Sequence, residues 1–119
     1  MRLLDVRTKL VLAAAGLALA ALPWNILSGG AAAANADSAA VVAKGRQLFN
    51  DYACGTCHVL GDAGGDGHVG PSLDGDAGLT KELVINRVTN GQGPMPGFGG
   101  QMSDEEIKTL ADYVVAAKK

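Results

Sequence analysis

The sequence predicts a small all-α domain, and three observations support this prediction. The chain has 119 residues, which leaves room for one domain. Three segments in its later part show helical periodicity or helix-capping residues, and no segment shows the polar and apolar alternation of a half-buried strand. Beyond an apolar leader, only four aromatic residues remain to build a core. A chain with so little core is often stabilised by a metal, a disulfide or a cofactor.

Residues 1–36 are predicted to be a signal peptide. A basic start precedes an uninterrupted apolar run over residues 10–22, and Ala34-Asn35-Ala36 fits the small-x-small pattern of a cleavage site before Asp37. The alternative is an uncleaved membrane anchor, because the apolar run, extended to Leu27, has about the length of a membrane span. In both cases the basic end stays cytoplasmic and the domain, residues 37–119, lies on the other side of the membrane.

The predicted domain is mildly acidic. It has seven basic and eleven acidic side chains, for a net charge of −4. Nucleic-acid binding requires a basic face, so we expect no nucleic-acid partner.

The first helix is expected to begin at a cap, Asp37 or Ser38, and to run to about Tyr52. Its apolar residues fall on one face: Val41, Val42, Gly45, Leu48, Phe49 and Tyr52. Glycine in a helix centre costs about 1 kcal/mol relative to alanine. Gly45 therefore either marks a close crossing with another helix or is simply tolerated.

Two further helices are indicated by their caps. Thr80 can cap a helix over residues 81–90, which Gly91 would end at a position that tolerates positive φ. Ser103 to Glu106 form a capping box that opens the last helix. The apolar face of that helix follows the expected spacing: Ile107, Leu110, Ala111 and Val114, with Tyr113 beside them.

The motif Cys54-Gly55-Thr56-Cys57-His58 predicts the attachment site of one c-type haem. Two thiols at this spacing can form thioethers with the two vinyl groups of one porphyrin. The next residue, His58, then lies beneath the iron as its proximal ligand. Cys54 and Cys57 are the only cysteines in the chain.

Two interpretations of the same motif omit haem. Cys54 and Cys57 form a thiol–disulfide pair in one of them, but that motif normally accompanies a β-α-β pattern, which the sequence lacks. In the other, both cysteines and His58 bind zinc, which requires a fourth ligand such as His68 or an acidic residue.

Pro71 is a candidate for orienting His58. A metal-bound histidine usually donates its other ring N–H to an acceptor, and the Pro71 carbonyl can accept it. This proline follows a glycine-rich segment, residues 61–70, which matches no phosphate-binding fingerprint. The alternative is a turn proline with no contact to the histidine.

The sixth iron ligand separates electron transfer from catalysis, because haem held by His and Met has no vacant site. Met95 is the favoured candidate, since Pro94 and Pro96 stiffen the loop that carries it. Met102 precedes the Ser103 cap and is expected to pack at the helix start. His68 is expected to be exposed to solvent.

The chain resembles the class I c-type cytochromes. The resemblance covers residues 39–117 and rests on Cys54 to His58, Gly70 to Leu73, Asn90 to Pro96 and Leu110 to Val114. It implies a small domain of three main helices wrapped around one covalent haem c, with His58 and Met95 as the iron ligands and Pro71 as the hydrogen-bond acceptor. The first and last helices of this family cross near a small residue and an aromatic, here Gly45, Phe49 and Tyr113. More loosely, residues 60–64 and Gly70-Pro71 resemble small cytochrome subunits of bacterial sulfite dehydrogenases.

The resemblance implies a periplasmic electron carrier and not an enzyme. Its expected partners are redox proteins, a dehydrogenase as donor and an oxidase or another cytochrome as acceptor. Contact with a membrane is expected only if the leader remains as an anchor. The alternatives are a haem subunit of an enzyme complex, and a haem sensor or catalyst with a labile distal ligand. No side chain from Gly91 to Ser103 is charged, so the docking patch is expected to be neutral and partly apolar.

Overall fold

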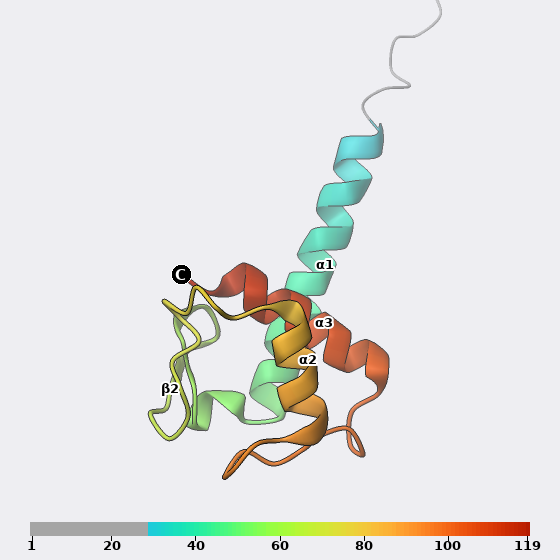
Figure 1. Cartoon of the computed structure of the whole chain (residues 1–119). Coiled ribbons are helices and arrows are strands. Elements are labelled where there is room, and N and C mark those ends of the chain that lie inside the picture. The colour runs from blue at the N-terminus through green and yellow to red at the C-terminus, as the bar shows by residue number, and fades with distance from the viewer. Residues whose placement is uncertain (1–28) are drawn as a thin grey trace, which may run out of the picture.

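The computed structural model describes residues 29–119 (Figure 1). The basic start and the apolar run of the predicted signal peptide lie outside the described residues. Within residues 29–119, no helix combines the length and the apolar character that a membrane span requires.

The first helix, α1, spans Gly29–Asp51, so the expectation that it begins at Asp37 or Ser38 is wrong. Both residues lie inside the helix, and the Ser38 hydroxyl donates to the Asn35 carbonyl at 2.9 Å. Alanine has the highest helix propensity, and the preceding alanine-rich residues contain nothing that would stop the helix. As a result, the first part of α1 projects beyond the rest of the domain (Figure 1).

The expected apolar face of α1 is confirmed except at one residue. Val42, Gly45, Leu48, Phe49 and Tyr52 are buried or half-buried. Val41 is the exception, at 37% exposed.

A small hairpin, residues 59–66, follows α1. Strand β1 (Val59–Leu60) pairs antiparallel with β2 (Gly65–Asp66), and the short 3-10 helix η3 (Gly61–Ala63) connects them. Gly64 closes this turn with a φ of 70°. The sequence shows no alternating pattern here, because strands of two residues are too short to produce one. The fold is nevertheless predominantly helical, as predicted.

The second and third helices have the predicted bounds and caps. Helix α2 spans Lys81–Asn90, the Thr80 hydroxyl accepts from the Leu83 amide, and Gly91 ends the helix with a φ of 73°. Helix α3 spans Asp104–Ala117 and begins with the complete Ser103–Glu106 capping box. All five residues predicted for its apolar face are buried.

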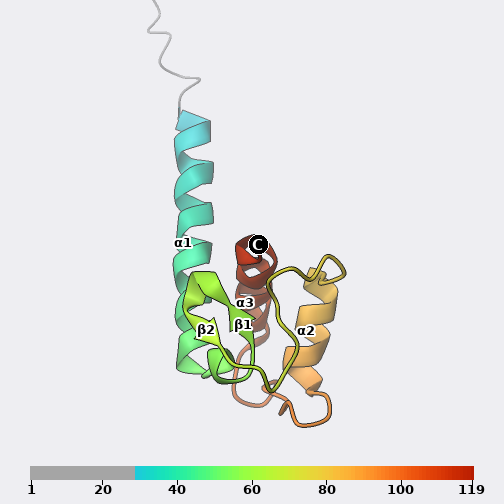
Figure 2. The same cartoon turned by 90° about the vertical axis from the view of Figure 1, so that its left-hand side faces the viewer.

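The helices pack around α3, which contacts both α1 and α2. Figure 2 shows α3 between the other two helices, with the hairpin in front. Gly45 lies where α1 meets α3, and a Cβ atom built on it would clash with the Tyr113 side chain, 2.7 Å from Cγ. The ring of Phe49 packs edge-on against that of Tyr113, with centroids 6.5 Å apart. The close crossing at Gly45 is thus confirmed.

We predict that Gly45→Ala destabilises the protein. The added methyl has no space against Tyr113, and overpacking of this kind costs about 1–3 kcal/mol, more than the ~1 kcal/mol gained in helix propensity. The free energy of unfolding in guanidinium chloride measures the effect. Gly100→Ala is the matched control, since nothing lies within 4 Å of its Cβ position, and it should stay within about 0.5 kcal/mol of the parent. Equal stability of the two variants would contradict the steric argument.

Candidate functional site

The cysteine-histidine motif forms a tight turn directly after α1. The 3-10 helix η2 (Cys54–Thr56) begins after Ala53, which has a left-handed φ of 54°. The amides of Cys57 and His58 both donate to the Cys54 carbonyl, at 3.1 and 3.0 Å. This turn brings the two cysteines and the histidine to the edge of one cavity.

Both cysteines are free thiols and are half-buried. Burial raises the pKa of Cys54 to about 11. A thiol–disulfide exchange centre has a lowered thiol pKa instead, because the thiolate is the reacting species. The raised pKa of Cys54 therefore argues against the interpretation of the motif as a thiol–disulfide exchange centre.

The His58 ring lies against the backbone of Gly70 and Pro71. Its Nδ1 is 2.8 Å from the Pro71 carbonyl oxygen, where an Nδ1–H donates a hydrogen bond. A Cβ atom at Gly70 would lie 2.8 Å from the same Nδ1, so only glycine lets the ring come this close. The Gly70 amide in turn donates to the Cys57 carbonyl at 2.8 Å, which joins this segment to the motif. With Nδ1 engaged, Nε2 is the nitrogen available to a metal.

The cavity has a volume of about 580 Å³ and a mainly apolar wall. That volume lies in the usual range for small-molecule and cofactor sites. All three helices contribute to the wall, through Phe49, Leu83, Val84, Leu110 and Val114. An apolar cavity with two thiols and one imidazole at its edge fits a large planar cofactor such as haem.

The two methionine candidates occupy different environments. Met95 lines the cavity, and its loop is closed by reciprocal backbone hydrogen bonds of 3.0 Å between Gln92 and Met95. Met102 is only 4% exposed and packs in the core without lining the cavity. His68 is exposed and does not line the cavity either. The structure therefore brings Met95, but neither alternative, to the cavity that His58 borders.

Sequence reasoning missed two charged residues of the cavity wall, Asp76 and Arg87. Among residues 29–119, Arg87 is the only Lys or Arg side chain that lines the cavity. The sequence contained a signal for Arg87, because Arg87 lies three residues after Val84 and next to Val88, on the buried side of α2.

The structure does not support the interpretation of the motif as a zinc site. Among residues 29–119, no three His, Cys, Asp or Glu side chains are grouped so as to hold a metal ion.

Comparison with known proteins identifies the family of the chain. The profile of the family described as "Cytochrome C oxidase, cbb3-type, subunit III" matches residues 40–114. Chloroplastic cytochrome c6 of Chlamydomonas reinhardtii is 40% identical over 106 residues, which are 82% of this chain and 66% of that protein. Cytochrome c6 of Euglena gracilis is 40% identical over 77 residues, 59% of this chain and 85% of that protein.

Two solved structures are similar in both sequence and fold. The c-type cytochrome SorU from Sinorhizobium meliloti is 41% identical, with a TM-score of 0.59 over 65% of this chain and 90% of that one. Cytochrome c6 from the diatom Phaeodactylum tricornutum is 40% identical, with a TM-score of 0.52 over 63% of this chain and 91% of that one. With the family profile, these matches show that the chain belongs to the cytochrome c family, as a class I c-type cytochrome that carries one covalent haem c and transfers electrons without being an enzyme.

Proposed function

We propose that the protein is an exported, periplasmic electron carrier whose haem is attached through Cys54 and Cys57 and ligated by His58 and Met95. One observation carries the assignment of these residues: all four line a single apolar cavity. The proposed domain is residues 37–119, released by cleavage of the signal peptide 1–36. If the leader is retained, the same domain is held at the outer face of the membrane.

Haem c supplies a one-electron couple, and the protein sets its ligands, orientation and solvent exposure. The chain's contribution begins with the imidazole of His58. A hydrogen bond from Nδ1 to Pro71 fixes the ring and leaves Nε2 for the iron. The apolar wall limits the contact of the site with water, which lowers the dielectric around the redox centre.

A thioether from Met95 would complete the coordination and leave no open position for a substrate. Two proline neighbours restrict the backbone that carries it. Its partners are then redox proteins, which we take to be a dehydrogenase that donates the electron and an oxidase or cytochrome that accepts it.

The visible spectrum tests the ligand set. We expect the protein, expressed with haem-maturation machinery, to be low-spin and to show the weak ferric sulfur-to-iron band. Met95→Ala should abolish this band because it removes the sulfur. Met102→Ala is the matched control and should keep the band, although the cavity it leaves in the core costs about 2–5 kcal/mol of stability. A band that survives Met95→Ala but not Met102→Ala would reverse the assignment.

Arg87 is proposed to face the carboxylate groups that haem carries. In the described part of the chain no other Lys or Arg lines the cavity, and removing this positive charge favours the oxidised, more positive form of the centre. We therefore predict that Arg87→Gln lowers the reduction potential by up to about 40 mV, the equivalent of ~1 kcal/mol for one electron. Potentiometric titration measures the shift, and Lys108→Gln on the exposed side of α3 is the control. A shift of equal size in both variants would show that net charge alone is responsible.

The loop 91–103 is proposed as the docking surface. It contains no charged side chain, and Pro94 and Pro96 are exposed on it beside Met95. Electrostatic steering makes association rates fall steeply with ionic strength, and a neutral surface lacks this dependence. We predict that oxidation by an anionic and by a cationic inorganic complex will both depend only weakly on salt. A steep and opposite dependence for the two oxidants would contradict a neutral surface.

A further inference from the structure

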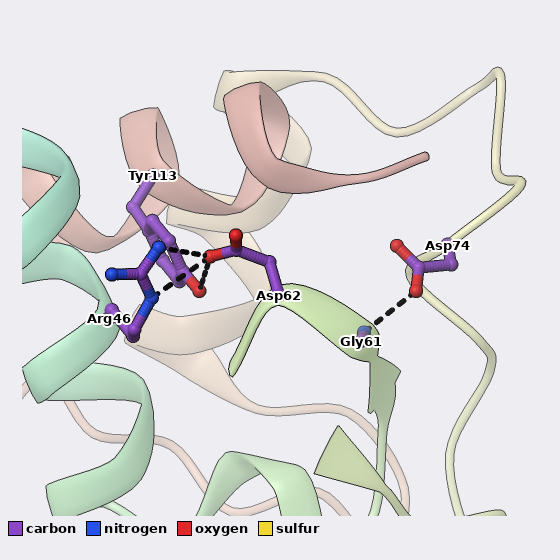
Figure 3. A network of polar contacts seen from close by, with 5 residues as sticks. All are labelled: Arg46, Gly61, Asp62, Asp74 and Tyr113. Atoms are coloured by element: carbon purple, nitrogen blue, oxygen red, sulfur yellow. Dashed lines mark hydrogen bonds and ion pairs between the residues drawn. The ribbon is translucent and has the colours of Figure 1, made fainter. Parts of the chain in front are cut away.

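A polar cluster lies outside the cavity. It consists of Arg46, Asp62 and Tyr113, which we call the Asp62 cluster (Figure 3). One carboxylate oxygen of Asp62, Oδ2, accepts three hydrogen bonds: from Tyr113 Oη at 2.7 Å, from Arg46 Nη2 at 2.8 Å and from Arg46 Nε at 3.0 Å. None of the three residues lines the cavity.

The cluster joins three elements at the crossing of the helices. Arg46 belongs to α1 and follows Gly45, Tyr113 belongs to α3, and Asp62 belongs to η3 of the hairpin. The Arg46 guanidinium also lies over the Tyr113 ring, 5.8 Å from its centroid. Asp62 therefore attaches the hairpin to the place where α1 and α3 are already in closest contact.

The hairpin in turn packs on the attachment turn. A Cβ atom at Gly65 would lie 2.7 Å from the His58 carbonyl oxygen, and one at Gly55 would lie 2.9 Å from the Gly65 Cα. These distances show that the hairpin backbone lies directly against the motif, with no room for a side chain between them. The position of the hairpin and the position of His58 are thus mechanically coupled.

A second set of contacts connects the hairpin with the segment that carries Pro71. The Leu73 amide donates to the Val59 carbonyl at 2.9 Å. The Gly61 amide, beside Asp62 in the chain, donates to the Asp74 carboxylate at 2.8 Å (Figure 3). The hairpin therefore contacts His58 on one side and, on the other, the residues that directly follow Pro71.

We propose that Asp62 is a positioning residue for the haem ligand: by holding the hairpin on the α1–α3 crossing, it maintains the placement of His58 against Pro71. This inference rests on the proposed role of His58 as iron ligand. If Asp62 had only a structural role, its replacement would lower the stability of the fold but leave the placement of His58 in the folded protein unchanged.

The charges around Asp62 determine how the cluster responds to pH. Tyr113 from α3, Arg46 from α1 and, more weakly, Lys119 at the end of the chain lower the pKa of Asp62, while its partial burial opposes them. Asp74 is the acidic neighbour on the remaining side. Because the pKa is lowered in the folded protein, the contribution of Asp62 is present above its unfolded pKa and is lost as pH falls through the folded value.

Tyr113→Phe is the sharpest test, because it deletes one hydrogen bond and keeps both the ring and the net charge. Losing that donor brings the pKa of Asp62 closer to its ordinary value. We expect the sulfur-to-iron band to disappear, on acid titration, at a midpoint about half a pH unit higher than in the parent. Asp62→Asn removes the titrating group, so its band should be weakened even at neutral pH. Asp66→Asn, at an exposed carboxylate of the same hairpin, is the matched control and should behave as the parent.

Hydrogen exchange provides a readout that does not depend on iron ligation. In Tyr113→Phe, the amides of Gly67 and Leu73, which bind the Gly55 and Val59 carbonyls, should exchange roughly three- to tenfold faster. Amides of α2 should be unaffected. If the parent itself lacks a low-spin spectrum, the proposed ligands are wrong, and the exchange data still test the cluster.

The proposal is overturned if Tyr113→Phe and Asp62→Asn lower only the melting temperature, with the acid midpoint and the exchange at Gly67 and Leu73 as in the parent. If Tyr113→Phe does not fold, the comparison of Asp62→Asn with Asp66→Asn decides the matter alone, by the band at neutral pH and by the same two amides.

Discussion

The close crossing of α1 and α3 is the constraint on which the rest of the structure depends. Gly45 lets the Tyr113 side chain reach the backbone of α1, and this approach sets the position of α3. Leu110 and Val114, on the same helix, then form part of the cavity wall. A side chain of any size at residue 45 would move α3 outward and open the wall, because protein interiors are close-packed and transmit such shifts.

The attachment turn has two different neighbours. It borders an apolar cavity of about 580 Å³, and the hairpin, which the Asp62 cluster joins to α1 and α3, packs against its backbone. A small chain with few aromatics cannot fill such a cavity with its own side chains, so the cofactor completes the core. Burial of Tyr113 and its hydrogen bond to Asp62 raise the pKa of that phenol to about 12, so it remains a donor throughout the physiological range.

Much of the fold could be predicted because its signals are local. The caps at Thr80 and Ser103 and the glycine at residue 91 act within one helical turn, and the structure has all three as expected. The start of α1 was predicted incorrectly for the same reason. Asp37 and Ser38 are good caps locally, but the alanines before them favour continuation of the helix. The strand pair β1–β2 was not apparent in the sequence because each strand has only two residues, too few for an alternating pattern.

By itself, the sequence determined the chemistry: two thiols and a histidine at the spacing of haem attachment, three helical segments, and a glycine where two helices had to meet. Only the tertiary structure decided which methionine borders the cavity, that Arg87 reaches its wall, and that Arg46, Asp62 and Tyr113 share one oxygen atom. The physical reason is the separation of these residues along the chain. Spacing specifies chemistry within a few residues, whereas contacts between residues 46, 62 and 113 exist only after the helices have packed.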